Sequence, residues 1–290
     1  MGEQYFVGQE ADPRVPDWRS LSLPDAWPDS LNFRNPKELF AFLVQMAGKS
    51  RQRVEIPADM PGANRIPKYI LQEFHNLPNG NYSKRITRGY ITGFDRMMLG
   101  SLNKVRQQVV GVMRGLQSVV DIGCGGGHLA NALQRAGVAD VWGVDPSPYL
   151  LQHAATDYPK VKFVQGIAEQ TGFAEQRFDG IAICFLLHEL PPKYLDGALA
   201  EFHRILKAGG LLAISEPSAL QMDCSWWQVW RQWGWRGLYF ALLAKLVHEP
   251  FVKAWHQQDI VAKLAQFGFE LVSDEDQLPI RQIVARKVVR

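Results

Sequence analysis

A histidine and a glutamate stand side by side where an apolar stretch of the chain ends. The segment Ile183-Cys184-Phe185-Leu186-Leu187-His188-Glu189-Leu190-Pro191 predicts a strand that ends just before this pair. The imidazole of His188 titrates near neutral pH, and Glu189 can orient it or take a proton from a bound molecule. We take His188 and Glu189 as candidate catalytic residues. A packed histidine that bonds to backbone at a strand end is the alternative, and the sequence leaves both open.

A second segment with chemical potential is a glycine-rich turn. An apolar run from Ser118 breaks into glycines and resumes with helix formers up to Ala130, which predicts a strand, a tight turn and a helix N-terminus. Glycines allow positive φ and close approach to the backbone, and the helix N-terminus attracts an anionic group. The dinucleotide fingerprint G-x-G-x-x-G would end at position 128, which is histidine, so the spacing disfavours a dinucleotide. The pattern present is Asp121-x-Gly123-x-Gly125-x-Gly127.

An acidic residue follows the glycine turn at the distance along the chain where a ribose-binding carboxylate is expected. About 20 residues beyond the first glycine, the run Val141-Trp142-Gly143-Val144-Asp145 predicts a strand that ends in a carboxylate. Such a carboxylate accepts hydrogen bonds from both ribose hydroxyls. A ligand with one ribose and a carboxylate-bearing tail would satisfy both segments.

Together these two segments resemble the class I S-adenosylmethionine (SAM)-dependent methyltransferases. The resemblance implies that SAM is the cofactor, that S-adenosylhomocysteine is the product, and that the acceptor is a small molecule. It also implies sites for each part of the cofactor. The methionine end would lie at Asp121, Gly123, Gly125 and Gly127, the ribose at Asp145 and Pro146, and the adenine at Ile167 and Ala168, flanked by Cys184 and Phe185, with Tyr82 and Tyr90 as lid candidates.

This chain departs from the family pattern at one position, and a second motif narrows the resemblance to a sub-group. Many relatives place Asp after the glycine of the third strand, where this chain has Ile167, so adenine recognition falls to backbone groups of Ile167 and Ala168 or to Glu169. The His-Glu-Leu-Pro sequence at His188 resembles a small-molecule sub-group of the family. The segment beginning at His248, His-Glu-Pro-Phe, also recurs in that sub-group.

The elements that must position these residues alternate along the chain. Strands are expected at 117–122, 139–145, 161–166, 179–185, 210–215, 269–273 and 280–287, and helices near 126–136, 148–156, 193–206 and 255–267. Alternation of this kind predicts an α/β fold with a parallel sheet. No helix separates the last two strands, so they should pair antiparallel. The resemblance implies a Rossmann-like seven-stranded sheet of order 3-2-1-4-5-7-6 with the last strand antiparallel.

Two regions exceed this core. Residues 1–115 should form an N-terminal arm and helical lid, with a proline-rich arm to about residue 34, a helix from Pro36 towards Gly48 and a helix over 68–76. The methyltransferase domain should occupy 116–290 and carry a cap insertion at 217–251. Alternatively, residues 1–115 only cover one edge of the sheet. The tryptophan-rich insertion has three alternatives, namely an acceptor pocket, a helix on a membrane surface, and a helical cap whose tryptophans are core.

Composition limits the remaining choices. The 290 residues are 47% hydrophobic with a net charge of +3, too little to argue for nucleic acid. Three dispersed cysteines fit a reducing compartment, so we expect a cytoplasmic protein. No uncharged apolar run is long enough to predict a transmembrane segment. Peripheral membrane contact and a homodimer stay open.

No metal is predicted, because nothing has metal-motif spacing, although five side chains could converge as ligands: His75, His188, Glu189, His248 and Glu249. Three other functions also stay open. They are transfer or cyclisation of the aminocarboxypropyl arm of SAM with release of methylthioadenosine, methylation of a quinone or lipid at a membrane, and SAM binding without catalysis.

Overall fold

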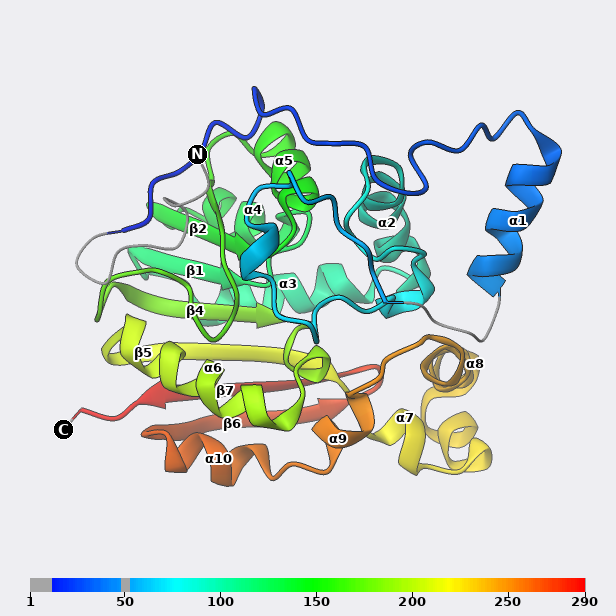
Figure 1. Ribbon diagram of the computed structural model, residues 1–290. Coiled ribbons are helices and arrows are strands. Elements are labelled where there is room, and N and C mark those ends of the chain that lie inside the picture. Colours follow the sequence, from blue (N-terminus) through cyan, green and yellow to red (C-terminus); the bar gives the residue numbers. More distant parts are fainter. Residues whose placement is uncertain (1–11, 48–52, 290) are drawn as a thin grey trace.

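The protein is built around one seven-stranded sheet, here described from a computed structural model that covers residues 12–47 and 53–289. The strand order is β3-β2-β1-β4-β5-β7-β6 (Figure 1). Strand β7 runs antiparallel to both β5 and β6, whereas the other neighbours are parallel. The predicted Rossmann-like order and antiparallel last strand are therefore confirmed. The strands are β1 Ser118–Ile122, β2 Asp140–Asp145, β3 Lys162–Gln165, β4 Phe178–Cys184, β5 Leu206–Pro217, β6 Phe269–Gln277 and β7 Ile280–Lys287.

The direction of β7 follows from the length of its connection. Only Leu278 and Pro279 separate β6 from β7. Parallel neighbours need a crossover of a dozen residues or more, so two residues permit only a hairpin.

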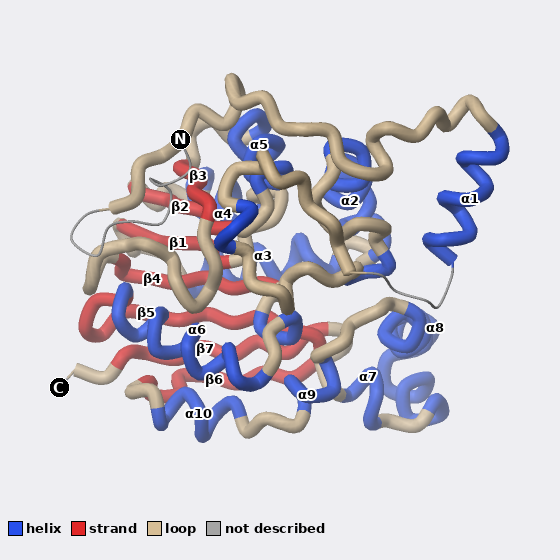
Figure 2. Tube along the Cα trace, viewed as in Figure 1, coloured by secondary structure: helices blue, strands red, loops and turns tan. Residues whose placement is uncertain are grey.

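Helices cover both faces of the sheet (Figure 2). On one face α3, α4 and α5 share a core with Val119 and Val141, and on the other α6, α9 and α10 share a core with Val120 and Ile122. Successive residues of β1 thus enter opposite cores, as the two-residue period of a strand requires. The helices are α1 Pro36–Ala47, α2 Lys84–Met97, α3 Ser101–Val112, α4 His128–Arg135, α5 Pro148–Asp157, α6 Pro192–Ile205, α7 Leu220–Asp223, α8 Trp226–Leu246, α9 Val252–His256 and α10 Ile260–Gln266.

The N-terminal arm lies along α5 and the edge strand β3. The indole nitrogen of Trp18 donates a buried hydrogen bond to the Phe163 carbonyl (2.8 Å). The amide of Gln152 on α5 donates to the carbonyls of Trp18 and Leu21. The arm before Asp12 and the expected helix end at Gly48 lie outside the described residues.

Two of the expected helices were wrong. Residues 68–76 contain only a short 3-10 turn, η2 Phe74–Asn76. The backbone of Gln72 forms an antiparallel β-bridge with Arg53 and so does not continue into a helix. The helix expected over 255–267 is two helices, α9 and α10, because Asp259 interrupts the run and caps α10 by accepting from the Ala262 amide (3.0 Å).

Helix α8 carries the tryptophans of the insertion. Ser225 and Gln228 form a capping box at its start. Its apolar residues are partly core and partly surface: Val229, Phe240 and Ala241 are buried, whereas Trp227 is 68% exposed. The insertion is therefore neither wholly a core cap nor wholly a surface helix. Among residues 12–47 and 53–289, no helix has the length and apolarity needed to span a bilayer.

Candidate functional site

A cavity of about 900 Å³ opens at the carboxyl ends of β1 to β4, where ligands of parallel sheets bind. The turn after β1, the end of β2, the segment after β3 and the end of β4 all contribute to its wall. Ten of the predicted site residues line it: Tyr82, Tyr90, Gly123, Gly125, Asp145, Pro146, Ile167, Ala168, Phe185 and Glu189. The other four, Asp121, Gly127, Cys184 and His188, lie outside its lining.

The glycines of the turn have different environments. Gly125 has φ of 51°, and a Cβ atom there would enter open space, so the backbone is accessible to a ligand. A Cβ atom at Gly127, which has φ of 78°, would lie 2.8 Å from Phe163. Gly127 therefore lets the turn pack on the sheet instead of facing the cavity.

Asp145 stands at the end of β2 with both carboxylate oxygens engaged by backbone. One oxygen accepts from the amide of Gly125 and the other from that of Ser147, each at 2.9 Å. Burial raises the pKa of Asp145 to about 6 although these two hydrogen bonds lower it. Each carboxylate oxygen has two acceptor positions, so two remain for a ligand.

Beyond β3, the cavity wall is formed by Gly166, Ile167 and Ala168. Glu169 is engaged elsewhere, because it accepts a hydrogen bond from the hydroxyl of Tyr69 (2.6 Å). This geometry favours backbone groups of Ile167 and Ala168 for contact with a base.

A second cavity adjoins the first through Tyr90, Gly123, Gly125 and Phe185. Asp121 and Cys184 line it. The buried carboxylate of Asp121 accepts from the Ala130 amide in the first turn of α4 (3.1 Å), and burial raises its pKa to about 7.

The same cavity holds an ion pair that sequence reasoning missed. Arg106 of α3 and Asp95 of α2 form a two-pronged pair, with nitrogen–oxygen distances of 2.5 and 2.7 Å. No motif marks these residues, and only the packing of α2 beside α3 brings them to the glycine turn.

A third, apolar cavity of about 600 Å³ lies between the sheet and α8. Its wall includes Phe94, Met97, Met98, Met222, Phe240, Leu243 and Val252. Phe185, directly after β4, lines all three cavities. Its φ is 60°, an unfavourable value for a bulky residue, and such strain concentrates at functional positions.

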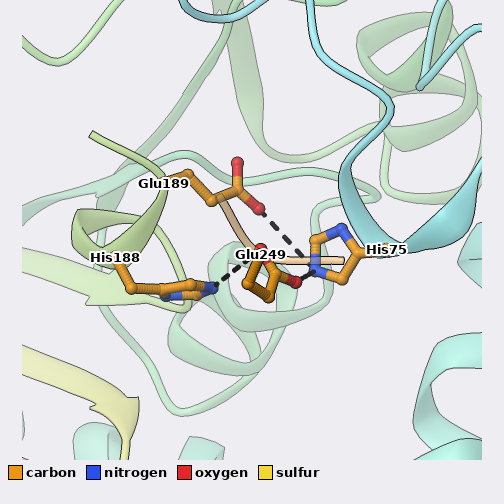
Figure 3. A group of neighbouring side chains, drawn as sticks. All are labelled: His75, His188, Glu189 and Glu249. Carbon is orange, nitrogen blue, oxygen red and sulfur yellow. Dashed lines mark ion pairs between the residues drawn. The ribbon is translucent and has the colours of Figure 1, made fainter. Parts of the chain in front are cut away.

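Four titratable side chains meet where the first and third cavities adjoin (Figure 3). His75 Nε2 lies 3.7 Å from Glu189 and 3.2 Å from Glu249, and His188 Nε2 lies 3.8 Å from Glu249. The fifth side chain considered from sequence, that of His248, is not part of this group. The residues come from η2, from η3 (Leu187–Glu189) and from the segment between α8 and α9.

The protonation of this group follows from its burial and partners. Burial opposes the charge on His188, but the carboxylate of Glu216, 2.6 Å from Nδ1, outweighs it and raises the pKa of His188 to about 9. Burial and the neighbouring Glu249 raise the pKa of Glu189 well above its usual value. Burial lowers the pKa of His75. Near pH 7 His188 is thus charged, whereas His75 is neutral.

Comparison with known proteins agrees with the resemblance seen in the sequence. A profile described as a methyltransferase domain matches residues 119–210, which contain the glycine turn, Asp145 and the His188 segment. This match supports the class I SAM-dependent methyltransferase family that the sequence resembles. An uncharacterized methyltransferase of Synechocystis sp. is 40% identical over 98 residues, which are 34% of this chain and 46% of that protein. A demethylmenaquinone methyltransferase of Chlorobaculum parvum is 36% identical over 114 residues, which are 39% of this chain and 46% of that protein.

The similarity to this methyltransferase family is confined to part of the chain. The chain spans about half the length of these curated relatives. Among solved structures, a chain from the complex of the Haloferax volcanii Trm112 methyltransferase activator with a methyltransferase is 14% identical, with a TM-score of 0.50. That match covers 70% of this chain and 98% of the other, and it shows a shared fold.

Proposed function

We propose that this protein transfers the methyl group of SAM to a small, largely apolar acceptor. The observation that carries the proposal is the position of Phe185, which borders both cavities at the glycine turn and the apolar cavity under α8. A cofactor that fills the first two cavities and an acceptor that fills the third would meet beside this residue.

The walls of the first two cavities suit the parts of SAM. Asp145 has two acceptor positions for the ribose hydroxyls, and backbone groups of Ile167 and Ala168 suit the adenine. The methionine tail would extend into the second cavity, where Asp121 suits its ammonium group and the guanidinium of Arg106 suits its carboxylate. Tyr82 and Tyr90 would cover the cofactor, and burial raises the pKa of both, so their hydroxyls stay neutral.

The reaction would be an in-line displacement. The acceptor atom loses its proton to solvent and forms a bond to the methyl carbon, the S–CH₃ electron pair returns to sulfur, and S-adenosylhomocysteine leaves. His188 is poorly suited as the base, because Glu216 keeps it charged near neutral pH. Burial and the neighbouring Glu249 raise the pKa of Glu189, which favours its protonated form and makes it less available as a base. The rate enhancement would then come mainly from alignment of the two reactants.

A quinone or lipid acceptor met at a membrane surface is the second candidate. On α8, Trp227 and Leu246 are 68% and 64% exposed, and Trp226, Trp230 and Trp235 are exposed as well. Arg231, Arg236 and Lys245 on the same helix would favour anionic lipid. The relative from Chlorobaculum parvum is named for a quinone. The same exposed tryptophans would suit a homodimer interface.

The setting we propose is the cytoplasm. Cys124, Cys184 and Cys224 are all free thiols, as is usual in a reducing compartment.

The test is to incubate the purified protein with SAM and a set of flat apolar phenols and quinols. Adenosine-containing products are then identified by mass spectrometry. S-adenosylhomocysteine formed only with an acceptor would support the proposal. Methylthioadenosine formed above the enzyme-free control would mean that the aminocarboxypropyl arm is transferred or cyclised. Neither product, with SAM bound, would favour a non-catalytic binding protein.

A further inference from the structure

The four titratable side chains between the cavities form a group that the proposed reaction does not use as acids or bases. One ligand atom from each of His75, His188, Glu189 and Glu249 can be chosen so that all four lie within 4.8 Å of one another (Figure 3). Two imidazoles and two carboxylates are the donors that Zn²⁺, Fe²⁺ and Mn²⁺ accept. We propose that these four residues bind a divalent metal ion.

His188 is oriented as a metal ligand would be. Its Nδ1 lies 2.6 Å from the Glu216 carboxylate, and both side chains are 1% exposed. Glu216 also accepts from the backbone amides of Leu186, Leu187 and His188 itself, so its position behind His188 is fixed. The Nδ1 proton is thereby fixed, and Nε2, whose proton a bound metal ion would displace, is directed to the group. Metal-bound histidines almost always have such a carboxylate or carbonyl behind them.

The backbone around His75 is held in an unusual shape that brings two more ligands together. His75 and Asn76 both have φ near 60°, an unfavourable value that the fold must compensate. The Asn76 side chain donates to the Leu246 carbonyl and accepts from the His248 amide, each at 3.0 Å. The His75 amide donates to the His248 carbonyl (3.1 Å). These bonds fix Glu249 beside His75.

Hydrogen bonds within the protein do not satisfy the group. The Oε2 atom of Glu249 is buried without a hydrogen-bond partner. The pairwise distances of 3.2, 3.7 and 3.8 Å are ion-pair distances longer than good hydrogen bonds. Tetrahedral ligands about 2.1 Å from a metal lie about 3.4 Å apart. Small side-chain movements would therefore complete a coordination shell.

The position of the site suggests what the ion would do. His75 lines the first and third cavities, and Glu189 and Glu249 line one each. An ion there would bind an oxygen, nitrogen or sulfur donor of the acceptor beside the methyl group and lower its pKa. This role rests on the proposed function, whereas metal binding itself does not.

The test measures metal binding in the absence of SAM. Full-length protein without a histidine tag is treated with chelator, and Zn²⁺, Mn²⁺ and anaerobic Fe²⁺ are titrated by calorimetry, with Co²⁺ absorption as a report on the ligands. We expect a single equivalent of at least one of these ions. His75→Ala and the isosteric Glu249→Gln should each weaken binding roughly 100-fold or more. The matched controls His153→Ala and Glu175→Gln should not.

Two results would overturn the proposal. One is the absence of stoichiometric binding by any of the four ions, and the other is binding that survives both His75→Ala and Glu249→Gln. Circular dichroism identifies any variant that fails to fold, and Glu249→Gln preserves volume if His75→Ala does not fold. SAM affinity is measured separately on metal-free protein, so loss of the metal site and loss of the cofactor site give different results.

Discussion

Replacing Asp145 by Asn should separate cofactor binding from folding. The variant keeps the side-chain volume but replaces one carboxylate oxygen by an amide group, which cannot accept from a ribose hydroxyl. A hydrogen bond to a charged group contributes about 1.5–3 kcal/mol. At 1.4 kcal/mol per tenfold, the dissociation constant for SAM should rise about 10- to 150-fold.

The stability of the same variant should change little, because two effects offset. One backbone amide, of Gly125 or Ser147, loses its acceptor, which costs about 1–3 kcal/mol. In the other direction, the pKa of Asp145 is raised by burial from 3.8 to about 6, so the charged form destabilises the fold by about 3 kcal/mol above pH 6. This penalty is absent below pH 3.8, and Asn does not incur it.

Isothermal calorimetry at pH 7.5 measures the dissociation constant for SAM, and thermal unfolding measures the stability of the variant. The matched control is Glu201→Gln on α6, because Glu201 is also buried and also accepts from a backbone amide, that of Thr171 (2.9 Å). The control should lose stability and keep its SAM affinity. An unchanged dissociation constant in Asp145→Asn, or an equal loss in the control, would refute the ribose assignment.

Three further predictions test other parts of the structure. The SAM affinity of the native protein should fall at least about fivefold between pH 6 and pH 5, because Asp145 binds a proton below about 6; calorimetry across this range checks it, and a flat profile would contradict it. Arg106→Gln should weaken SAM binding about tenfold or more through loss of a charged hydrogen bond, whereas exposed Arg114→Gln should not. Trp18→Phe should lower the melting temperature by a few degrees, because the buried Phe163 carbonyl loses its donor; an unchanged melting temperature would show that the arm contributes nothing there.

Local sequence signals were sufficient for the sheet and for the segments that follow its strands. The glycine turn and Asp145 are defined by their own neighbours, and parallel strands bring their carboxyl ends to one edge. The strand order beyond that came from the family resemblance. Where tertiary contacts override local preference, the prediction was wrong, as at residues 68–76, where pairing of Gln72 with Arg53 prevents a helix.

Residues that are distant in the sequence and meet only in the fold had no local sequence signal. His75 and Glu249 become neighbours only because Asn76 is hydrogen-bonded to the end of α8. Arg106 has no motif around it, and its place beside the glycine turn depends on how α3 packs. The sequence named all four residues of the group that contains His75 and Glu249, but spacing alone could not show their convergence.

The arm over β3 has a consequence for shortened versions of this protein. Strand β3 is the last strand at one edge of the sheet, and an uncovered edge is a template for intermolecular strand pairing. Trp18 covers this edge by bonding to its Phe163 carbonyl. A truncated protein that begins after the arm would expose β3 and should aggregate, so the arm protects solubility even though it lies outside the methyltransferase profile match.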